Sequence, residues 1–179
     1  QFLKAYYHFY LFQLYGPIII ADKNQPISST PEEVRLKRSP IDSVVNYISN
    51  LLDTAAINLP EVIINQSTEL GRVTKPVALA MKARLWVTAA SHLFNGNKDF
   101  QNFTYKDGMH LFNTEVDASK WGRAVLACKE AVESCETNGI GLYYFNSFLD
   151  LSDTTVTKLS IRNAISEKWN NELVWGLSG

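Results

Sequence analysis

Apolar residues recur at spacings of three and four along much of the chain, which is the pattern of a helix with one buried face. Between residues 41 and 59 they form one continuous stripe, and polar residues fall on the opposite side. The stripe consists of Ile41, Val44, Val45, Ile48, Leu52, Ala55, Ala56 and Leu59. With Ser39 as N-cap, Pro40 at the first helical position and Pro60 as a stop, the sequence predicts a core helix here.

A second helix is expected after Thr74, which is suited to the N-cap position, with Pro76 in the first turn. Residues 77–94 include only two Lys or Arg residues, Lys82 and Arg84, and five alanines. A helix that is apolar nearly all round is expected at the centre of a fold, and small side chains allow neighbouring helices to approach closely. The run 95–97 (Asn-Gly-Asn) is expected to end this helix.

A third helix is expected to be capped by Asp117 and to end at Asn138 and Gly139. Charged residues alternate with an apolar stripe, so the stripe is predicted to be its buried face. The stripe consists of Trp121, Ala124, Val125, Cys128, Val132 and Cys135.

The two ends of the chain carry further elements. An aromatic, apolar run over residues 1–14 predicts a first helix. Residues 142–151 are interpreted as another aromatic helix, residues 158–168 as a weaker helical candidate, and residues 172–177 as a short strand. Because residue 1 is Gln and the first run has no cap before it, we interpret the chain as an internal fragment of a longer protein.

Together these elements predict an all-α fold of layered helical hairpins in a single domain, residues 1–179, with a short strand at the C-terminal end. The capped helices near Pro40 and Ala118 begin about 78 residues apart. A regular tetratricopeptide repeat recurs about every 34 residues. The sequence therefore predicts degenerate tetratricopeptide-like repeats with long loops.

Composition narrows the possible functions. The 179 residues include 17 Lys and Arg against 18 Asp and Glu, a formal net charge of −1. This balance excludes the strong basic field of a nonspecific nucleic-acid binder and offers no polybasic patch for anionic lipid. No stretch reaches the roughly 18 uncharged apolar residues that a membrane span needs.

No pattern in the sequence predicts catalysis, a metal site or a cofactor. His8, His92 and His110 are scattered, without a second ligand at metal-binding spacing. The G-x-S-x-G, Walker and Rossmann glycine motifs are absent. Cys128 and Cys135 would lie roughly 10 Å apart on one helix, beyond the about 7 Å that a disulfide allows. We interpret them as small core residues, with a redox pair as the alternative.

Aromatic residues are the unusual feature of the composition, at 12% of the chain. Those on the predicted helices are explained by core packing. The long loop over residues 96–115 carries Phe100, Phe103 and Tyr105, and loops lie at the surface. Exposed rings stack on sugars or dock on a protein, whereas the alternative is collapse onto the helices beneath. From loop position alone, these three residues are the candidate ligand-binding residues.

Five segments, in order, resemble motifs of the SusD/RagB family of outer-membrane lipoproteins. Residues 6–18 (YYHFYLFQLYGPI) resemble "YYF-x-L-x-x-x-YG-x-(I/V)P", and residues 38–60 resemble the next helix, which closes on "A-x-x-x-LP". Residues 71–97 look like "GR-(x)-T-K-x-A-A…K-A-R…A-A-SPLFNG", with His92 in place of the usual Pro and Val77 in place of an Ala. Trp121 with Ala124, and residues 171–175, resemble the last two motifs.

The resemblance implies a binding protein without catalysis or cofactor, exposed at the cell outer membrane of Bacteroidetes-type bacteria. Such proteins are lipid-anchored through an N-terminal cysteine, which is absent from this chain. They cover a SusC-like TonB-dependent barrel and capture oligosaccharide or polysaccharide, or sometimes peptide, for import. Family members are considerably longer, so this chain would be the helical, tetratricopeptide-like part of a larger SusD-like domain. No ligand-contacting residue is carried over from the resemblance.

Two hypotheses outside the family remain. A helical-repeat scaffold would bind only another protein, which suits the concave surfaces of stacked helices. A surface glycosidase would need two converging carboxylates, a feature that spacing along the sequence does not reveal.

Overall fold

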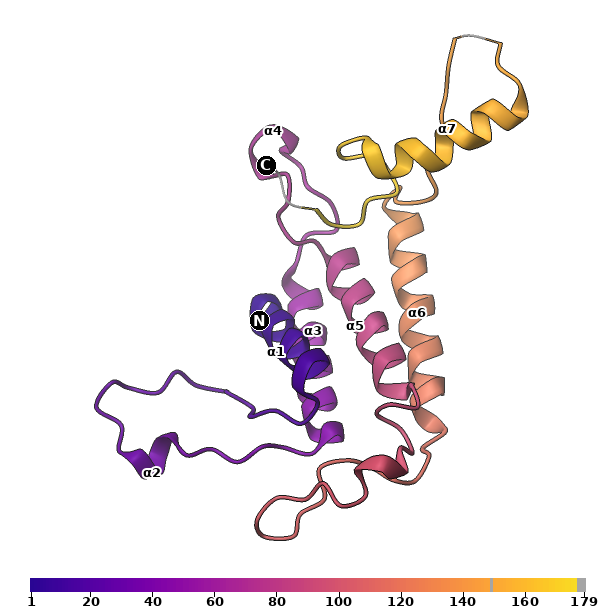
Figure 1. Ribbon diagram of the computed structural model, residues 1–179. Helices are drawn as coiled ribbons and strands as arrows, with labels where there is room; N and C mark the ends of the chain where they lie inside the picture. Colours follow the sequence, from indigo (N-terminus) through magenta and orange to yellow (C-terminus); the bar gives the residue numbers. More distant parts are fainter. Residues whose placement is uncertain (149, 177–179) are drawn as a thin grey trace.

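The computed structural model describes residues 1–148 and 150–176, and its regular secondary structure consists of helices joined by long loops (Figure 1). The helices are α1 (Phe2–Tyr15), α2 (Pro31–Val34), α3 (Ile41–Asn58), α4 (Gln66–Glu69), α5 (Lys75–Ala90), the 3₁₀ helix η1 (Lys98–Phe100), α6 (Ser119–Thr137) and α7 (Asp153–Ser166). Over these residues the only β pairing is an isolated antiparallel bridge between Thr104 and His110. The predicted all-α fold is therefore confirmed. No helix in the described part has the length and apolar character needed to cross a membrane.

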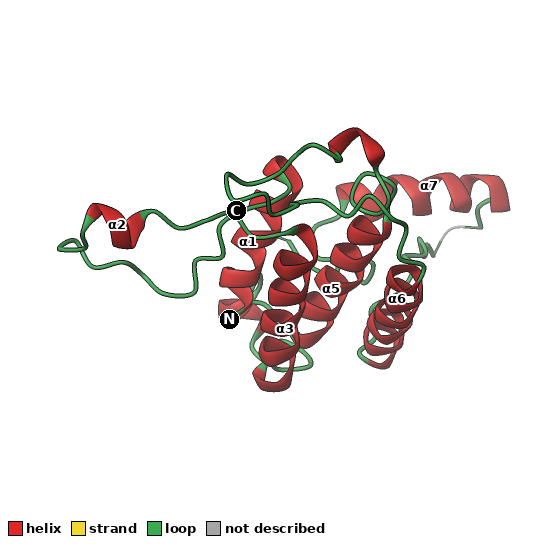
Figure 2. Cartoon of the chain, turned by 90° about the horizontal axis from the view of Figure 1, so that it is seen from below, coloured by secondary structure: helices red, strands yellow, loops and turns green. Residues whose placement is uncertain are grey.

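The four long helices α1, α3, α5 and α6 form a row that is clearest from below (Figure 2). α1 packs on α3, α3 on α5 and α5 on α6, and α1 also touches α5. α5 is thus flanked on both sides, as its alanine-rich, nearly uncharged sequence predicted. α2 and α4 are single turns within the connections.

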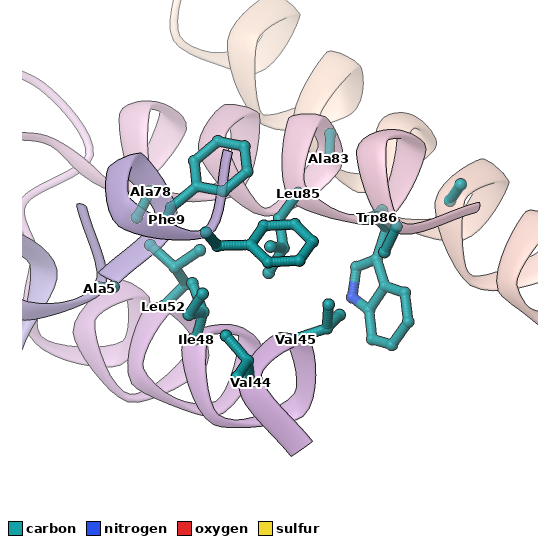
Figure 3. Packing of buried hydrophobic residues seen from close by; sticks show 14 of the residues in the cluster. Ala5, Phe9, Val44, Val45, Ile48, Leu52, Ala78, Ala83, Leu85 and Trp86 are labelled. Carbon is teal, nitrogen blue, oxygen red and sulfur yellow. The ribbon is translucent and has the colours of Figure 1, made fainter. Parts of the chain in front are cut away.

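The main core lies between α1, α3 and α5 (Figure 3). Phe9 and Phe12 of α1 meet Ile48 and Leu52 of α3, and Leu85 of α5 closes the cluster. Burying one such side chain stabilises the fold by about 1.5–3 kcal/mol. The stripe predicted on α3 is buried from residue 41 to residue 56, which confirms that part of the sequence analysis.

Two helix boundaries differ from the sequence-based expectation. α3 begins one residue late: Pro40 is the N-cap, its carbonyl accepts from the Val44 amide at 3.1 Å, and the Ser39 amide donates to the carbonyl of Ile18. α5 starts at its expected N-cap, Thr74, but ends at Ala90 rather than continuing to residue 94. The Ser91 hydroxyl donates to the carbonyl of Thr88 at 2.6 Å, and this local bond competes with further helix.

The buried face of α6 is only partly the predicted one, because it includes Ala124 and the half-buried Cys128 but not the large members of the stripe. Ala124, Ala127 and Ala131 are buried, whereas the large members of the predicted stripe, Trp121 and Val125, are 51% and 65% exposed. The alanines face α5, since small side chains permit the closest helix approach. The larger residues point away from the only described helix on which α6 packs.

Two details of α6 complete that comparison. The helix begins at Ser119 with Ala118 at the N-cap, one residue later than expected. The Asp117 carboxylate nevertheless accepts a hydrogen bond from the Ser119 amide, at 2.9 Å, so it does cap a free N–H. Cys128 and Cys135 are both free, in agreement with the spacing argument.

The C-terminal predictions were wrong in part. Residues 142–148 and 150–151 are irregular, and Leu149 lies outside the described residues. The amides of Tyr143 and Phe145 bond to the side chains of Glu172 and Ser160, so distant side chains replace helical carbonyls. The helix is instead α7, which contains most of the 158–168 candidate but starts five residues earlier, after its N-cap Ser152.

The predicted strand over residues 172–176 is also wrong, and residue 177 lies outside the described part. These residues find no strand to pair with among the described segments. Trp175 instead packs edge-on against Phe2 and Tyr6 of α1, and its indole N–H donates to the carbonyl of Gly71 at 3.0 Å. The Trp175 indole thereby attaches the C-terminal segment to α1, the first helix of the row.

Candidate ligand-binding surface

Two long connections meet beside the same ends of the parallel-lying helices. The α1–α3 loop (residues 16–40) and the α5–α6 loop (residues 91–118) both extend from the lower end in Figure 1. The amide of Ile41 donates to the carbonyl of Leu111 at 3.0 Å. Lys37 Nζ lies 2.6 Å from Asp107 Oδ2. The candidate residues Phe100, Phe103 and Tyr105 therefore belong to a surface built by both loops.

Phe100 and Phe103 pack on a third loop ring, Phe112. The Phe100 ring stacks on Phe112 with centroids 4.2 Å apart and planes 17° apart. Phe103 meets Phe112 edge-on at 5.7 Å, and Phe112 in turn stacks on the buried Phe94. One face of Phe100 is thus covered, whereas Phe103 keeps 41% of its surface exposed. The loop rings have partly collapsed onto the fold, and Phe103 is the one that remains most open to a ligand.

Tyr105 stands apart from that stack, at the start of a tight turn. Its amide donates to the carbonyl of Met109, and its carbonyl accepts from the amide of Gly108, at 2.8 and 2.9 Å. Gly108 has a φ of +83°, which a residue with a Cβ adopts only with strain. The Lys37 ammonium lies 5.4 Å from the Tyr105 ring centroid, within cation–π range. The turn therefore presents a ring beside an ion pair.

The Lys37–Asp107 ion pair sets the electrostatics of this turn. The hydrogen bond from Lys37, followed by that from the backbone of Met109, lowers the pKa of Asp107 below its ordinary value. The same bond to Asp107 raises the pKa of Lys37. At neutral pH the two groups are a charged donor and a charged acceptor, side by side, with the ammonium over the Tyr105 ring. The pairing was missed in the sequence because the two residues lie 70 positions apart.

The α5–α6 loop also encloses a hollow of about 400 Å³. It is lined by His110, Phe112, Asn113, Thr114, Glu115, Val116 and Asp117. An imidazole, an amide and carboxylates supply polar groups there, whereas the Phe112 ring is only 8% exposed and stacks on both Phe100 and Phe94. The hollow therefore offers hydrogen-bonding groups to a ligand, and the ring forms part of its wall.

Other chemistry-bearing residues have structural partners. His8 is buried, and both of its ring nitrogens have hydrogen-bond partners. Nδ1 lies 2.7 Å from the carbonyl of Lys4, and Nε2 accepts from the amide of Ala21. Within residues 1–148 and 150–176, no three His, Cys, Asp or Glu residues gather as metal ligands. Burial is the main reason that the pKa of the Cys135 thiol is raised, which disfavours the reactive thiolate.

Comparison with known proteins places this fold. Residues 1–87 match a SusD-like family model described as "Starch-binding associating with outer membrane". The solved structures of BT4246 and of selenomethionine BT4246 align with 99% of this chain at 33% and 32% identity, with TM-scores of 0.77 and 0.73. The SusD-like resemblance is confirmed. A SusD-like protein (BF3747) from Bacteroides fragilis shares the fold over 98% of this chain, at 20% identity and a TM-score of 0.58.

The extent of these SusD-like matches matters for the site. The chain spans about a third of the first two structures, 34% and 33% of their lengths, and 25% of the BF3747 chain. No curated protein matches the chain. The family match ends at residue 87, before the α5–α6 loop begins. Phe100, Phe103 and Tyr105 therefore stay a prediction based on position and geometry.

Proposed function

We propose that this chain is the helical part of a larger SusD-like domain, in a surface-exposed outer-membrane lipoprotein that captures glycans. In this proposal the protein works with a SusC-like TonB-dependent barrel to import oligosaccharides and performs no catalysis itself. The observation that carries the proposal is the match of residues 1–87 to a family described as starch-binding and associated with the outer membrane. The alignment of 99% of the chain with BT4246 supports it.

Within this proposal, the surface built by the α1–α3 and α5–α6 loops contributes directly to glycan binding. Phe103 and the free face of Tyr105 would stack on sugar rings, each ring contributing about 0.5–1.5 kcal/mol beyond the apolar area it buries. Lys37 donates hydrogen bonds and Asp107 accepts them, which suits neighbouring hydroxyls on one sugar. Phe100 would act mainly as a support, because Phe112 already covers one of its faces.

The test is affinity electrophoresis of the full-length mature protein through gels that contain a panel of polysaccharides. We expect one glycan class to retard the wild-type protein. Tyr105→Ala and Phe103→Ala should each weaken binding about three- to tenfold, the equivalent of one stacked ring. Tyr144→Ala is the matched control, because Tyr144 is an exposed ring on a different segment, and it should bind like the wild type.

Other outcomes of the same experiment separate the alternatives. Release of reducing sugar by pure protein would contradict the proposal that there is no catalysis, and would revive the glycosidase hypothesis. Retardation that none of the loop variants changes would move the glycan site away from this surface. If no polysaccharide retards the protein, peptide cargo or a protein-only scaffold becomes the better hypothesis. The exposed apolar face of α6, with Trp121 and Val125, favours that scaffold as the second candidate.

A further inference from the structure

A buried lysine lies beneath the candidate surface, where α3 and α6 meet the α5–α6 loop. Lys120 is the first residue of the buried face of α6, and only 3% of its surface is exposed. Its ammonium lies 2.6 Å from Asp42 Oδ1 on α3 and donates to the carbonyl of Phe94, at the start of the loop, at 3.5 Å. A buried ammonium is costly unless it is paired, so its position is fixed by these partners.

The partners of Lys120 connect it to both ends of the loop. The second carboxylate oxygen of Asp42 accepts a hydrogen bond from the side-chain amide of Asn113. Asn95, next to Phe94, exchanges two hydrogen bonds with the backbone of Asp117: its Nδ2 donates to the carbonyl at 3.0 Å, and its Oδ1 accepts from the amide at 2.8 Å. The loop is thus closed at its base by Asn95 and Asp117, and joined to α3 through Asn113.

The two sides of the loop pack closely at this base. Gly96 has a φ of +82°, and a Cβ at this position would lie 2.3 Å from the side chain of Val116, near the other end of the loop. The amide of Gly96 donates to the carbonyl of Asn113 at 3.2 Å. The two sides of the loop are therefore in direct contact two residues after Phe94, whose carbonyl accepts from the Lys120 ammonium.

We propose that Lys120 is a positioning residue of the glycan surface: through Asp42, Phe94 and Asn113 it holds the α5–α6 loop in the conformation that presents Phe103 and Tyr105. It acts without touching the ligand, since its ammonium is buried under the loop. The part of the proposal that concerns binding rests on the proposed function, whereas the part that concerns the loop does not. Holding the rings in place before binding reduces the ordering cost that a glycan would otherwise meet.

The experiment measures loop order and affinity separately, in the full-length protein. Lys120→Met removes the charge and keeps a long apolar side chain. Hydrogen–deuterium exchange should become at least tenfold faster for amides in residues 96–117, while α3 stays protected. Affinity for the polysaccharide that retards the wild type should fall at least fivefold. Lys120→Arg, which keeps the charge, should restore most of both properties.

Control variants distinguish positioning from a general loss of stability. Lys129→Met removes an exposed lysine from the same helix and should leave loop exchange and affinity unchanged. Lys82→Met removes ion pairs between helices away from the loop, and it should lower stability without lowering affinity at temperatures where the protein is fully folded. If Lys120→Met does not fold, Asp42→Asn and Asn113→Ala test the same links one at a time.

Each result decides one part of the proposal. Unchanged exchange in residues 96–117 of the Lys120 or Asp42 variants would overturn it. Faster exchange with unchanged affinity would also overturn it, since the loop conformation would then not matter for binding. If the wild-type protein binds no polysaccharide, the proposed function fails, and the exchange data still decide whether Lys120 holds the loop.

Discussion

Helices α3 and α6 have similar sequence patterns and different environments. Each has large apolar residues at spacings of three and four, and for each we predicted that this stripe would be buried. On α3 the prediction is right, and Val44 and Ile48 are fully buried. On α6, Trp121 and Val125 are mostly exposed, and alanines form the contact face. Periodicity therefore shows where a helix groups its apolar residues, but it does not show which neighbour covers them.

The difference follows from the number of neighbours that each helix has. α3 lies between α1 and α5, so its large side chains fill space on two sides. Among the described helices, α6 packs only on α5, and the alanines on both helices bring their axes close together. Small residues at that contact leave the larger ones of α6 to face outward. The stripe is a property of the sequence, and its burial is a property of the assembly of helices.

The largest expected effect tests this comparison with one residue type in both helices. Leu52 on α3 is 1% exposed, and Leu126 on α6 is 69% exposed. Leu52→Ala should lower the free energy of unfolding by about 2–5 kcal/mol, since it removes buried methyl groups and leaves a cavity. Leu126→Ala should change it by less than about 0.5 kcal/mol. Urea denaturation of both variants measures the two values, and a large loss for Leu126→Ala would mean that α6 has a partner in solution.

A smaller effect is expected from overpacking the alanine face of α6. Ala127→Leu adds three carbons where α6 meets α5, at a residue that is 3% exposed, so we expect a loss of about 1–3 kcal/mol. Val125→Leu makes a change on the outward face of the same helix and should be nearly neutral. Thermal unfolding of the pair gives the difference. Equal stability of the two variants would contradict the close α5–α6 contact.

The sequence predicted the fold where local signals and helical period agree. Residues 74–90 carry both an N-cap and a uniform apolar pattern, and α5 appears where expected apart from its last turn. Around residues 142–148 the aromatic pattern favoured a helix, but Glu172 and Ser160, distant along the chain, bond to the backbone amides. A one-dimensional pattern contains no information about such partners.

The candidate site divides in the same way. Loop length and aromatic content identified Phe100, Phe103 and Tyr105, which belong to the α5–α6 connection. That connection lies at the lower end of the helices in Figure 1. Lys37 could not be assigned to this surface, because its pairing with Asp107 is created by folding. For Lys120 a signal did exist, since it precedes Ala124 by four residues on the face that proves to be buried. Choosing the larger apolar residues as the buried face concealed that signal.

The smallest expected effect concerns Lys82 of α5, whose ammonium joins the two helices compared above. Nζ lies 2.6 Å from Asp53 Oδ1 on α3 and 3.1 Å from Glu130 Oε2 on α6. Burial lowers the pKa of Lys82, but the hydrogen bonds to the two carboxylates outweigh burial and raise it overall. A raised pKa in the folded state means that the ammonium stabilises the fold fully below the ordinary lysine pKa, near 10.4. That stabilisation is lost as the pH rises through the folded-state value.

Lys82→Met should therefore lower the free energy of unfolding by up to about 1 kcal/mol at pH 7, the usual range for partly exposed ion pairs. The difference from wild type should stay constant up to about pH 10 and shrink above it, as the wild-type ammonium loses its proton. Asp53→Asn and Glu130→Gln separate the two links, and the shorter pair to α3 should account for more of the effect. A larger loss from Glu130→Gln would contradict this expectation, because the longer pair to α6 would then contribute more than the shorter pair to α3.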